Sequence, residues 1–259
     1  MRSIFSVATR ISVFVCALAS CTTTADAPDE AGGESPEQAA ISGTPDRLLN
    51  GAYTYYEVIA DLRKCPSPLC GGWFLKRLNR DTTRCVDGRA AESCYAPVLD
   101  WSEANLSVDQ QSKLIDAATK DATTSGVYGI VRGVFAPTNT TPRPELGRFV
   151  ISEAWVAEGA GVSEGAFVRV KDNGLRCLVA PCPSLTETTL NTPRTTNIAE
   201  LDWTPSGLSD REIEGLTGLL SSPDGILIAG HRYTVHENGQ TAKGRTVTNA
   251  YERLSDATP

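Results

Sequence analysis

The side chains in this sequence that could carry out chemistry are its eight cysteines, its two histidines and a repeated aspartate. Six of the cysteines lie in the body of the chain, at Cys65, Cys70, Cys85, Cys94, Cys177 and Cys182. Thiols form disulfides, hold metals or act as nucleophiles, and their spacing distinguishes these uses. The paired Cys-x2-Cys motifs of structural zinc sites are missing, so the sequence predicts disulfides and no metal. Phosphate-loop and dinucleotide glycine patterns are absent too, and we expect no cofactor.

The two histidines do not form a catalytic arrangement. His231 and His236 are five residues apart in a stretch that we expect to be a strand. An odd separation places two side chains on opposite faces of a sheet, so they are not expected to share a substrate or a metal. We predict no catalytic residue, and the sequence favours a protein that is not an enzyme.

The repeated aspartate precedes a tryptophan, in Leu99-Asp100-Trp101 and again in Leu201-Asp202-Trp203. One interpretation is a pair of carboxylates, one from each copy, that acts in acid–base chemistry. The other is structural: each aspartate accepts backbone hydrogen bonds where a strand bends into a loop, and each tryptophan covers the end of the core. Because the motif recurs at the entry to a helix, we favour the structural interpretation.

These motifs belong to an internal repeat that relates residues 52–157 to residues 165–253. The two copies share a Cys-x4-Cys after a basic residue, the Leu-Asp-Trp motif, a capped helix and a Gly-Arg motif, in the same order. The matching segments are 65–70 with 177–182, 99–101 with 201–203, and 147–150 with 244–247. The common order makes chance similarity improbable.

Each copy is predicted to have the element order β-β-β-α-β-β. The expected strands are 53–62, 73–78, 95–101, 127–135 and 149–156, then 166–171, 185–190, 197–203, 226–235 and 246–251. The helices begin at capping boxes, Ser107 with Gln110 and Ser209 with Glu212. The predicted fold class is therefore α+β and β-rich, a tandem duplication of one module. Small OB-like barrels share this order, and the alternative is a curved sheet with one packed helix.

The repeat also suggests which cysteines pair. The second copy keeps the Cys-x4-Cys motif but has no counterpart of Cys85 and Cys94. Two cysteines that are absent together are most simply bonded together. We therefore predict the disulfides Cys65–Cys70, Cys85–Cys94 and Cys177–Cys182.

The N-terminal 20 residues have the features of a secretory signal: Arg2 and Arg10, then an apolar stretch too short to span a bilayer. Leu18-Ala19-Ser20-Cys21 resembles the lipobox of bacterial lipoproteins. This resemblance implies cleavage before Cys21 and acylation of that residue. The alternative is an ordinary signal peptide that is cleaved after Ala19 or Ser20.

The remaining chain divides into a tether and two modules. Residues 21–46 are acidic, with almost no bulky apolar side chains, and we expect a disordered tether that spans roughly 25–30 Å. Module 1 is predicted at 47–160 and module 2 at 161–259. Thr22 after the acylated cysteine implies the outer membrane, on its periplasmic or its surface face. The formal charge of −7 argues against a nucleic acid as partner.

The two Cys-x4-Cys loops are the candidate binding sites. Each follows a basic residue and contains proline, so we expect both loops to be rigid and exposed, which lowers the entropy lost on binding. The candidate residues are Lys64, Pro66, Pro68, Arg176 and Pro181. Simple disulfide-linked turns between strands are the alternative interpretation.

A wider resemblance is visible in the first copy, in Tyr55-Tyr56, 61–65, 70–72, Cys94-Tyr95 and Leu99-Asp100. These residues resemble an uncharacterised, cysteine-containing domain family of bacterial lipoproteins of myxobacterial type. The second copy departs from that pattern, since Pro183-Ser184 replaces the two glycines. The resemblance implies a β-rich envelope protein with no known activity and transfers no catalytic residue.

The predicted function is a non-catalytic lipoprotein of the cell envelope that acts as a binding or structural module. Its expected partners are the membrane, through the acylated N-terminus, and an envelope protein or peptidoglycan. Two alternatives remain: an envelope hydrolase with a site between the modules, and a protease inhibitor that uses the disulfide-braced loops. Exposed aromatic residues around the loops would favour a binding module, and a titratable polar cluster in a pocket would favour an enzyme.

Overall fold

The computed structural model describes residues 54–124, 126–137, 146–159 and 161–255. The predicted signal peptide, the acylated Cys21 and the tether lie outside the described residues. By their internal contacts, all described residues fall in a single compact unit. No helix among them is long and apolar enough to cross a membrane.

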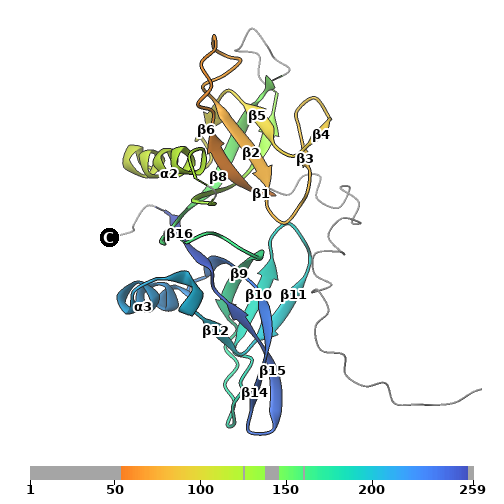
Figure 1. The fold of residues 1–259 in the computed structure, drawn as a ribbon, viewed down its shortest axis with the longest axis vertical. Helices are drawn as coiled ribbons and strands as arrows, with labels where there is room; N and C mark the ends of the chain where they lie inside the picture. The colour runs from red at the N-terminus through yellow and green to blue at the C-terminus, as the bar shows by residue number, and fades with distance from the viewer. Residues whose placement is uncertain (1–53, 125, 138–145, 160, 256–259) are drawn as a thin grey trace, which may run out of the picture. The chain divides into compact units, whose positions relative to one another are not determined.

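The first half of the described chain has eight strands and one helix (Figure 1). They are β1 (Thr54–Ala60), β2 (Trp73–Arg77), β3 (Thr83–Arg84), β4 (Ala90–Ala91), β5 (Cys94–Ala96), β6 (Leu99–Asp100), α2 (Val108–Asp121), β7 (Gly129–Ala136) and β8 (Arg148–Ala157).

The second half follows after the predicted module boundary. Its elements are β9 (Ala166–Asp172), β10 (Leu185–Thr189), β11 (Thr195–Ile198), β12 (Glu200–Asp202), the 3-10 helix η3 (Thr204–Ser206), α3 (Asp210–Leu219), β13 (Ile226–Gly230), β14 (Arg232–Glu237), β15 (Gln240–Thr246) and β16 (Asn249–Leu254).

One sheet runs through both halves. Its strand order is β11-β10-β9-β13-β16-β8-β7-β1-β2-β5, and β6 adds a short parallel pairing with β8. Outward from the central β16–β8 pair, the two halves place their strands in the same relative order. None of the described sheets closes into a barrel, so the OB-like barrel prediction is wrong. Strand β8 pairs with β7 and, over two residues, with β6 of its own half, and its far end pairs with β16 of the other half.

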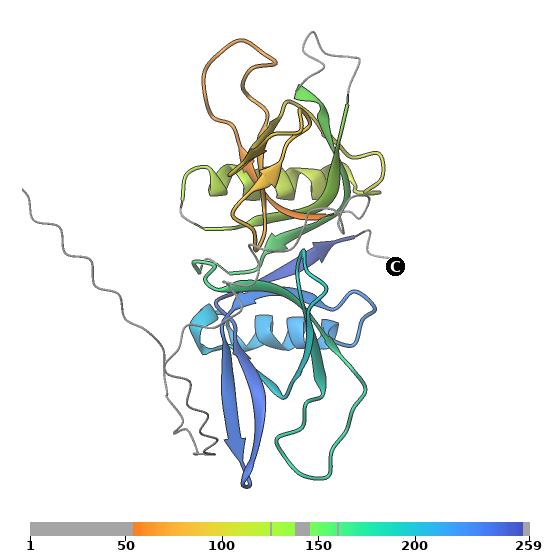
Figure 2. The ribbon, with the colours of Figure 1, turned by 90° about the vertical axis from the view of Figure 1, so that its right-hand side faces the viewer.

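Each helix covers one face of its own half (Figures 1 and 2). Leu114 and Ala118 of α2 are buried in an apolar cluster with the inward side chains of β1, β7 and β8. Leu216 of α3 and the adjacent Leu220 are buried in a second cluster with β9 and β13. Both helices begin where the sequence predicted: the side chain of Gln110 accepts from the Ser107 N–H (2.9 Å), and that of Glu212 from the Ser209 N–H (2.7 Å).

Several expected strands are broken by turns. The predicted strand 226–235 ends at Gly230, and β14 leaves the main sheet to form a three-stranded sheet with β15 and β12. A Cβ on Gly230 would lie 1.7 Å from the Thr246 carbonyl oxygen, so only glycine permits this crossing. His231 therefore lies between two strands, and both histidines are exposed.

A third apolar cluster joins the halves. Leu78, Ile130 and Trp155 of the first half pack with residues of the second half. Those second-half residues are Phe167, Leu190, Leu227, Ala229 and Tyr251. Because these side chains are removed from water only when both halves are present, the two predicted modules share part of their core.

Two asparagines add a reciprocal polar contact across the same boundary. Nδ2 of Asn79, just after β2, donates to the carbonyls of Phe167 (2.7 Å) and Leu190 (3.1 Å), and its Oδ1 accepts from the Phe167 N–H (2.9 Å). Asn191, just after β10, contacts the first half in the same way.

Nδ2 of Asn191 donates to the carbonyls of Tyr55 (2.8 Å) and Leu78 (2.9 Å), and its Oδ1 accepts from the Tyr55 N–H (2.9 Å). Both asparagines have positive φ, 55° for Asn79 and 61° for Asn191, a conformation that asparagine tolerates better than most residues. We call this pair of contacts the asparagine lock.

Buried charges reinforce the second half. The carboxylate of Glu187 on β10 is fully buried and pairs with the guanidinium groups of Arg245 and Arg232. Arg245, from the repeated Gly-Arg motif, also donates to the Gly230 carbonyl (2.6 Å). Removing one partner of such a group leaves an uncompensated buried charge, so this cluster ties β10 to the β14–β15 hairpin.

Replacing either locking asparagine by alanine should destabilise the whole chain. Asn79→Ala or Asn191→Ala removes three hydrogen bonds to backbone groups of the other half and strains a left-handed residue, and we expect a loss of about 3 kcal/mol or more in urea unfolding. Asn105 is the matched control, because it has φ of 50° and is exposed. Asn105→Ala should cost only about 1 kcal/mol. Equal losses in all three variants would contradict the lock.

Candidate functional site

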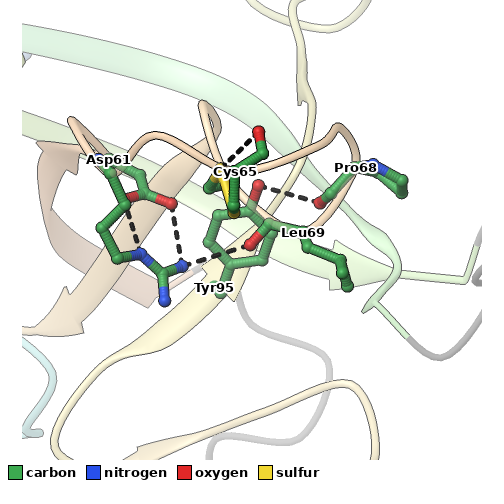
Figure 3. Close-up of a disulfide and its surroundings, with 7 residues drawn as sticks. Asp61, Cys65, Pro68, Leu69 and Tyr95 are labelled. Atoms are coloured by element: carbon green, nitrogen blue, oxygen red, sulfur yellow. Dashed lines mark hydrogen bonds and ion pairs between the residues drawn. A yellow bond between two sulfur atoms is a disulfide. The ribbon is translucent and has the colours of Figure 1, made fainter.

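The first Cys-x4-Cys loop connects β1 to β2 and is held by several contacts (Figure 3). The Asp61 N–H donates to the Gly72 carbonyl (2.9 Å) at its base, and Cys65 and Cys70 are bonded within it. Tyr95 OH donates to the Pro68 carbonyl (3.0 Å) from β5. A Cβ on Gly72 would lie 2.5 Å from the Ala96 carbonyl oxygen, so glycine is required where the loop lies against β5. These contacts fix the loop from both ends.

An ion pair lies inside this loop. Nε and Nη2 of Arg63 donate to the two carboxylate oxygens of Asp61, both at 2.8 Å, and Nη2 also donates to the Leu69 carbonyl (3.2 Å). The Asp61 side chain is 1% exposed, whereas that of Arg63 is 59% exposed. Hydrogen bonds from Arg63 lower the pKa of Asp61 from its ordinary value and outweigh its burial, so the pair is charged at neutral pH.

Two aromatic rings support the arginine. Phe74 on β2 and Tyr95 on β5 are cross-strand neighbours, with ring centroids 5.5 Å apart. The guanidinium carbon of Arg63 lies 5.1 Å from the Phe74 centroid and 5.7 Å from that of Tyr95. Both rings are only half-buried. We call Asp61, Arg63, Phe74 and Tyr95 the arginine platform.

The second Cys-x4-Cys loop has an ion pair, and no aromatic ring of the described residues lies against its arginine. Nη1 and Nη2 of Arg176 donate to the carboxylate of Asp172 (3.0 and 2.6 Å), and Nη1 also donates to the Leu175 carbonyl (2.7 Å). Hydrogen bonds from Arg176 lower the pKa of Asp172 to about 2. The loop is closed by the Asn173 N–H, which donates to the Ser184 carbonyl (2.9 Å).

The predicted loop residues differ in their surroundings. Lys64 and Pro66 are exposed, as expected for binding residues, and Pro68 is half-buried. Arg176 is exposed but held by Asp172. Pro181 is buried, so the expectation of an exposed proline there is wrong. Part of the second loop lies against the β14–β15 hairpin, where the Asn238 side chain donates to the Ala180 carbonyl (3.2 Å).

The three cysteine pairs lie at bonding distance: Cys65–Cys70 (2.13 Å), Cys85–Cys94 (1.93 Å) and Cys177–Cys182 (2.19 Å). These are the pairs that the repeat predicts. Among the described residues, no group of three or more histidine, cysteine or acidic side chains could hold a metal ion.

The repeated aspartates have backbone contacts of the kind that the structural interpretation requires. Oδ1 of Asp100 accepts from the Ser102 N–H, and Oδ1 of Asp202 accepts from the Thr204 N–H, both at 3.0 Å. Trp101 and Trp203 are half-buried against the clusters under α2 and α3, so they cover cores of open sheets and not barrel ends. These contacts support the structural interpretation, in which each aspartate stabilises the bend that follows its strand.

A polar cluster lies where β1, β7, β8 and β9 meet. Glu153 pairs with Arg132 and Arg169, and Arg169 also donates to Tyr55 OH. Both guanidinium carbons lie 5.6 Å from the Tyr55 ring centroid. Burial raises the pKa of Tyr55. Because the carboxylate of Glu153 is held by two arginines, the cluster is suited to joining strands and poorly suited to accepting a proton.

The sequence Gly161-Val162-Ser163-Glu164-Gly165 matches the Gly-x-Ser-x-Gly nucleophile motif. Its structural context is different, because it connects two strands and no helix follows. The Ser163 hydroxyl bonds to the hydroxyl of Tyr251 (2.6 Å) and accepts from Asn249 Nδ2 (3.1 Å). Burial strongly raises the pKa of Tyr251, so that hydroxyl is neutral and cannot serve as a base. Ser163 is a structural residue of the connection.

Other buried carboxyl groups also have structural partners. Burial raises the pKa of Asp121 to about 8, and its oxygens accept from the Tyr128 N–H (2.6 Å) and the Gly129 N–H (3.1 Å). Burial raises the pKa of Glu57 to about 7 beside its cross-strand neighbour Lys76. The Asp121 contacts join the end of α2 to the start of β7, and the charge of Lys76 partly offsets the effect of burial on the pKa of Glu57.

The main residues of the arginine platform were missed by sequence reasoning. Lys64, which directly precedes Cys65, was a predicted binding residue, but Arg63 is the residue that hydrogen bonds within the loop fix in place. The signal was the spacing Asp61-x-Arg63, which allows a carboxylate and a guanidinium to meet within one turn. Phe74 and Tyr95 could not be paired from sequence because β3 and β4 separate them along the chain.

Comparison with known proteins places the chain in a family of unknown function. A family model described as a domain of unknown function (DUF6748) matches residues 54–256, so the chain belongs to this family. The match takes in both halves of the described chain. No curated protein and no solved structure matches the chain.

Replacing Arg63 should raise the pKa of Asp61. In Arg63→Gln the hydrogen bonds that lower this pKa are lost, while burial, which raises it, remains. Native Asp61 stabilises the fold above the unfolded value of about 3.9, and this stability is lost as pH falls through the lower native pKa. In Arg63→Gln, the free energy of unfolding should therefore change less with pH in the range where Asp61 titrates.

Carboxyl-carbon NMR titration measures this pKa directly. The matched control is Arg176→Gln, which should move Asp172 and leave Asp61 unchanged. An unchanged Asp61 titration in Arg63→Gln would show that the ion pair does not set its charge.

Proposed function

We propose that the chain is a non-catalytic, membrane-anchored lipoprotein of the cell envelope that binds a protein partner through its first Cys-x4-Cys loop. The observation that carries the proposal is the arginine platform. A charged, half-exposed guanidinium is held by a buried carboxylate and two aromatic rings on a loop fixed at both ends. A binding group that is already ordered loses little entropy when a partner arrives.

The proposed compartment is supported by the cysteines and the N-terminus. Three disulfides suggest an oxidising environment outside the cytoplasm. The Leu18-Ala19-Ser20-Cys21 motif supports acylation of Cys21, and Thr22 supports the outer membrane. More than one acyl chain gives stable anchoring.

The other functions predicted from the sequence gain less support. Inhibition of a trypsin-like protease would require an exposed basic residue, and Arg176 is held by Asp172, which leaves Lys64. A hydrolase between the halves would need a base, and Glu153 in the cluster there is held by two arginines.

We also propose that the chain arose by tandem duplication. The strand order on either side of β16–β8, the equivalent contacts of Asn79 and Asn191, and the shared bends at Asp100 and Asp202 support this proposal. After duplication, only the first copy has the aromatic rings, so the two loops have different binding chemistry.

Photo-crosslinking in the producing cell tests the function. A benzophenone side chain at Leu69, which is exposed in the first loop, should give a discrete protein adduct after illumination. The same group at Ile115, exposed on α2, is the matched control and should give none. Adducts at both positions, or at neither, would contradict binding through this loop.

Palmitate labelling in the same cells tests the proposed lipid anchor at Cys21. The native chain should incorporate labelled palmitate and sediment with membranes, and Cys21→Ser should lose the label. A Cys21→Ser chain that keeps the label would contradict acylation at that residue.

A further inference from the structure

The arginine platform leaves part of Arg63 available to a ligand. Nε and Nη2 are used by Asp61 and Leu69, while Nη1 has no hydrogen-bond partner among the residues that the structure describes. The guanidinium cannot turn to use these donors elsewhere in the loop, because the carboxylate and the rings of Phe74 and Tyr95 hold it. A fixed guanidinium with unused donors suits a planar anionic acceptor.

The charge around Arg63 also favours an anion. The carboxylate of Asp61 is buried beneath the guanidinium, so the solvent side of the pair is positive. Lys64 is the next residue, exposed, and adds a second positive charge. This local excess stands out in a chain with a net charge of −7.

Apolar side chains flank the same charges. Leu62, which precedes Arg63 in the chain, is 55% exposed. Leu69, whose carbonyl accepts a hydrogen bond from Arg63, is 44% exposed. A ligand that satisfies both features carries a carboxylate beside aliphatic side chains. Peptides have this combination, whereas inorganic phosphate lacks the aliphatic part.

The second loop does not present the same chemistry. Arg176 uses both Nη1 and Nη2 on Asp172, and no aromatic ring lies against it among the described residues. The exposed side chains at its tip, Leu178 and Val179, are apolar. Arg176 is therefore a control for a charged pair on a Cys-x4-Cys loop that lacks the platform.

From these observations we infer that the first loop binds a peptide that carries a carboxylate beside aliphatic side chains. Arg63 Nη1 and Lys64 contact the carboxylate. Leu62 and Leu69 pack against the aliphatic side chains of the peptide. The inference rests on the proposed function and names the chemistry of its partner. The carboxylate is supplied by an acidic side chain or by a free peptide C-terminus.

Fluorescence anisotropy with three labelled hexapeptides tests the inference on the native chain in detergent. The first alternates leucine and glutamate with an amidated C-terminus, the second alternates leucine and glutamine with an amidated C-terminus, and the third is the second with a free C-terminus. We expect the first or the third to bind about tenfold more tightly than the second, and which of them does so identifies the source of the carboxylate.

Variants locate the binding. Arg63→Lys keeps a charge for Asp61 but removes the fixed fork, and it should weaken binding of the preferred peptide about tenfold. Lys64→Gln should weaken it about threefold without affecting the fold, because Lys64 is exposed. Arg176→Lys should change nothing. Equal binding of all three peptides, or equal losses in Arg63→Lys and Arg176→Lys, would overturn the inference.

The outcomes separate this inference from the proposed function. A crosslink at Leu69 without any carboxylate preference would overturn the ligand chemistry alone. A carboxylate preference without a crosslink would overturn the cellular partner alone.

Discussion

The asparagine lock is the contact on which the rest of the structure depends. Asn79 and Asn191 each satisfy both backbone groups of one residue and a carbonyl of another in the opposite half. Such groups are costly to bury without partners, so these amides stabilise the boundary where the third apolar cluster lies. The β8–β16 pairing then continues the sheet from one half into the other.

This arrangement also explains where the binding loops lie. Strand β2 begins after the first Cys-x4-Cys loop and ends just before Asn79, and β10 has the same relation to the second loop and Asn191. Each of these strands has a braced loop at one end and a locking asparagine at the other. The lock fixes the strand, and the strand with its neighbour β5 fixes Phe74 and Tyr95 under Arg63.

The sequence allowed the local structure to be predicted better than the long-range contacts. Capping boxes, alternating strands and the cysteine pattern act over a few residues, so the helix starts, most strands and the three cysteine pairs were found. The barrel prediction was wrong because the strand order within one half does not reveal whether its sheet closes, nor that β8 also pairs with β16 of the other half. Asn79 and Asn191 each follow a leucine, a similarity too short to recognise in the sequence without the contacts. Arg63 was not identified because the two rings that support it come from other elements, Phe74 from β2 and Tyr95 from β5.

The central claim is that the lock makes the two halves one folding unit, and native-state hydrogen exchange of the full chain tests it most directly. The backbone amides of β2 and β10 should exchange with the same free energy of opening. In Asn191→Ala that free energy should fall equally for both strands. A variant in which β10 loses protection while β2 keeps its native value would show that the halves unfold independently and would contradict the account.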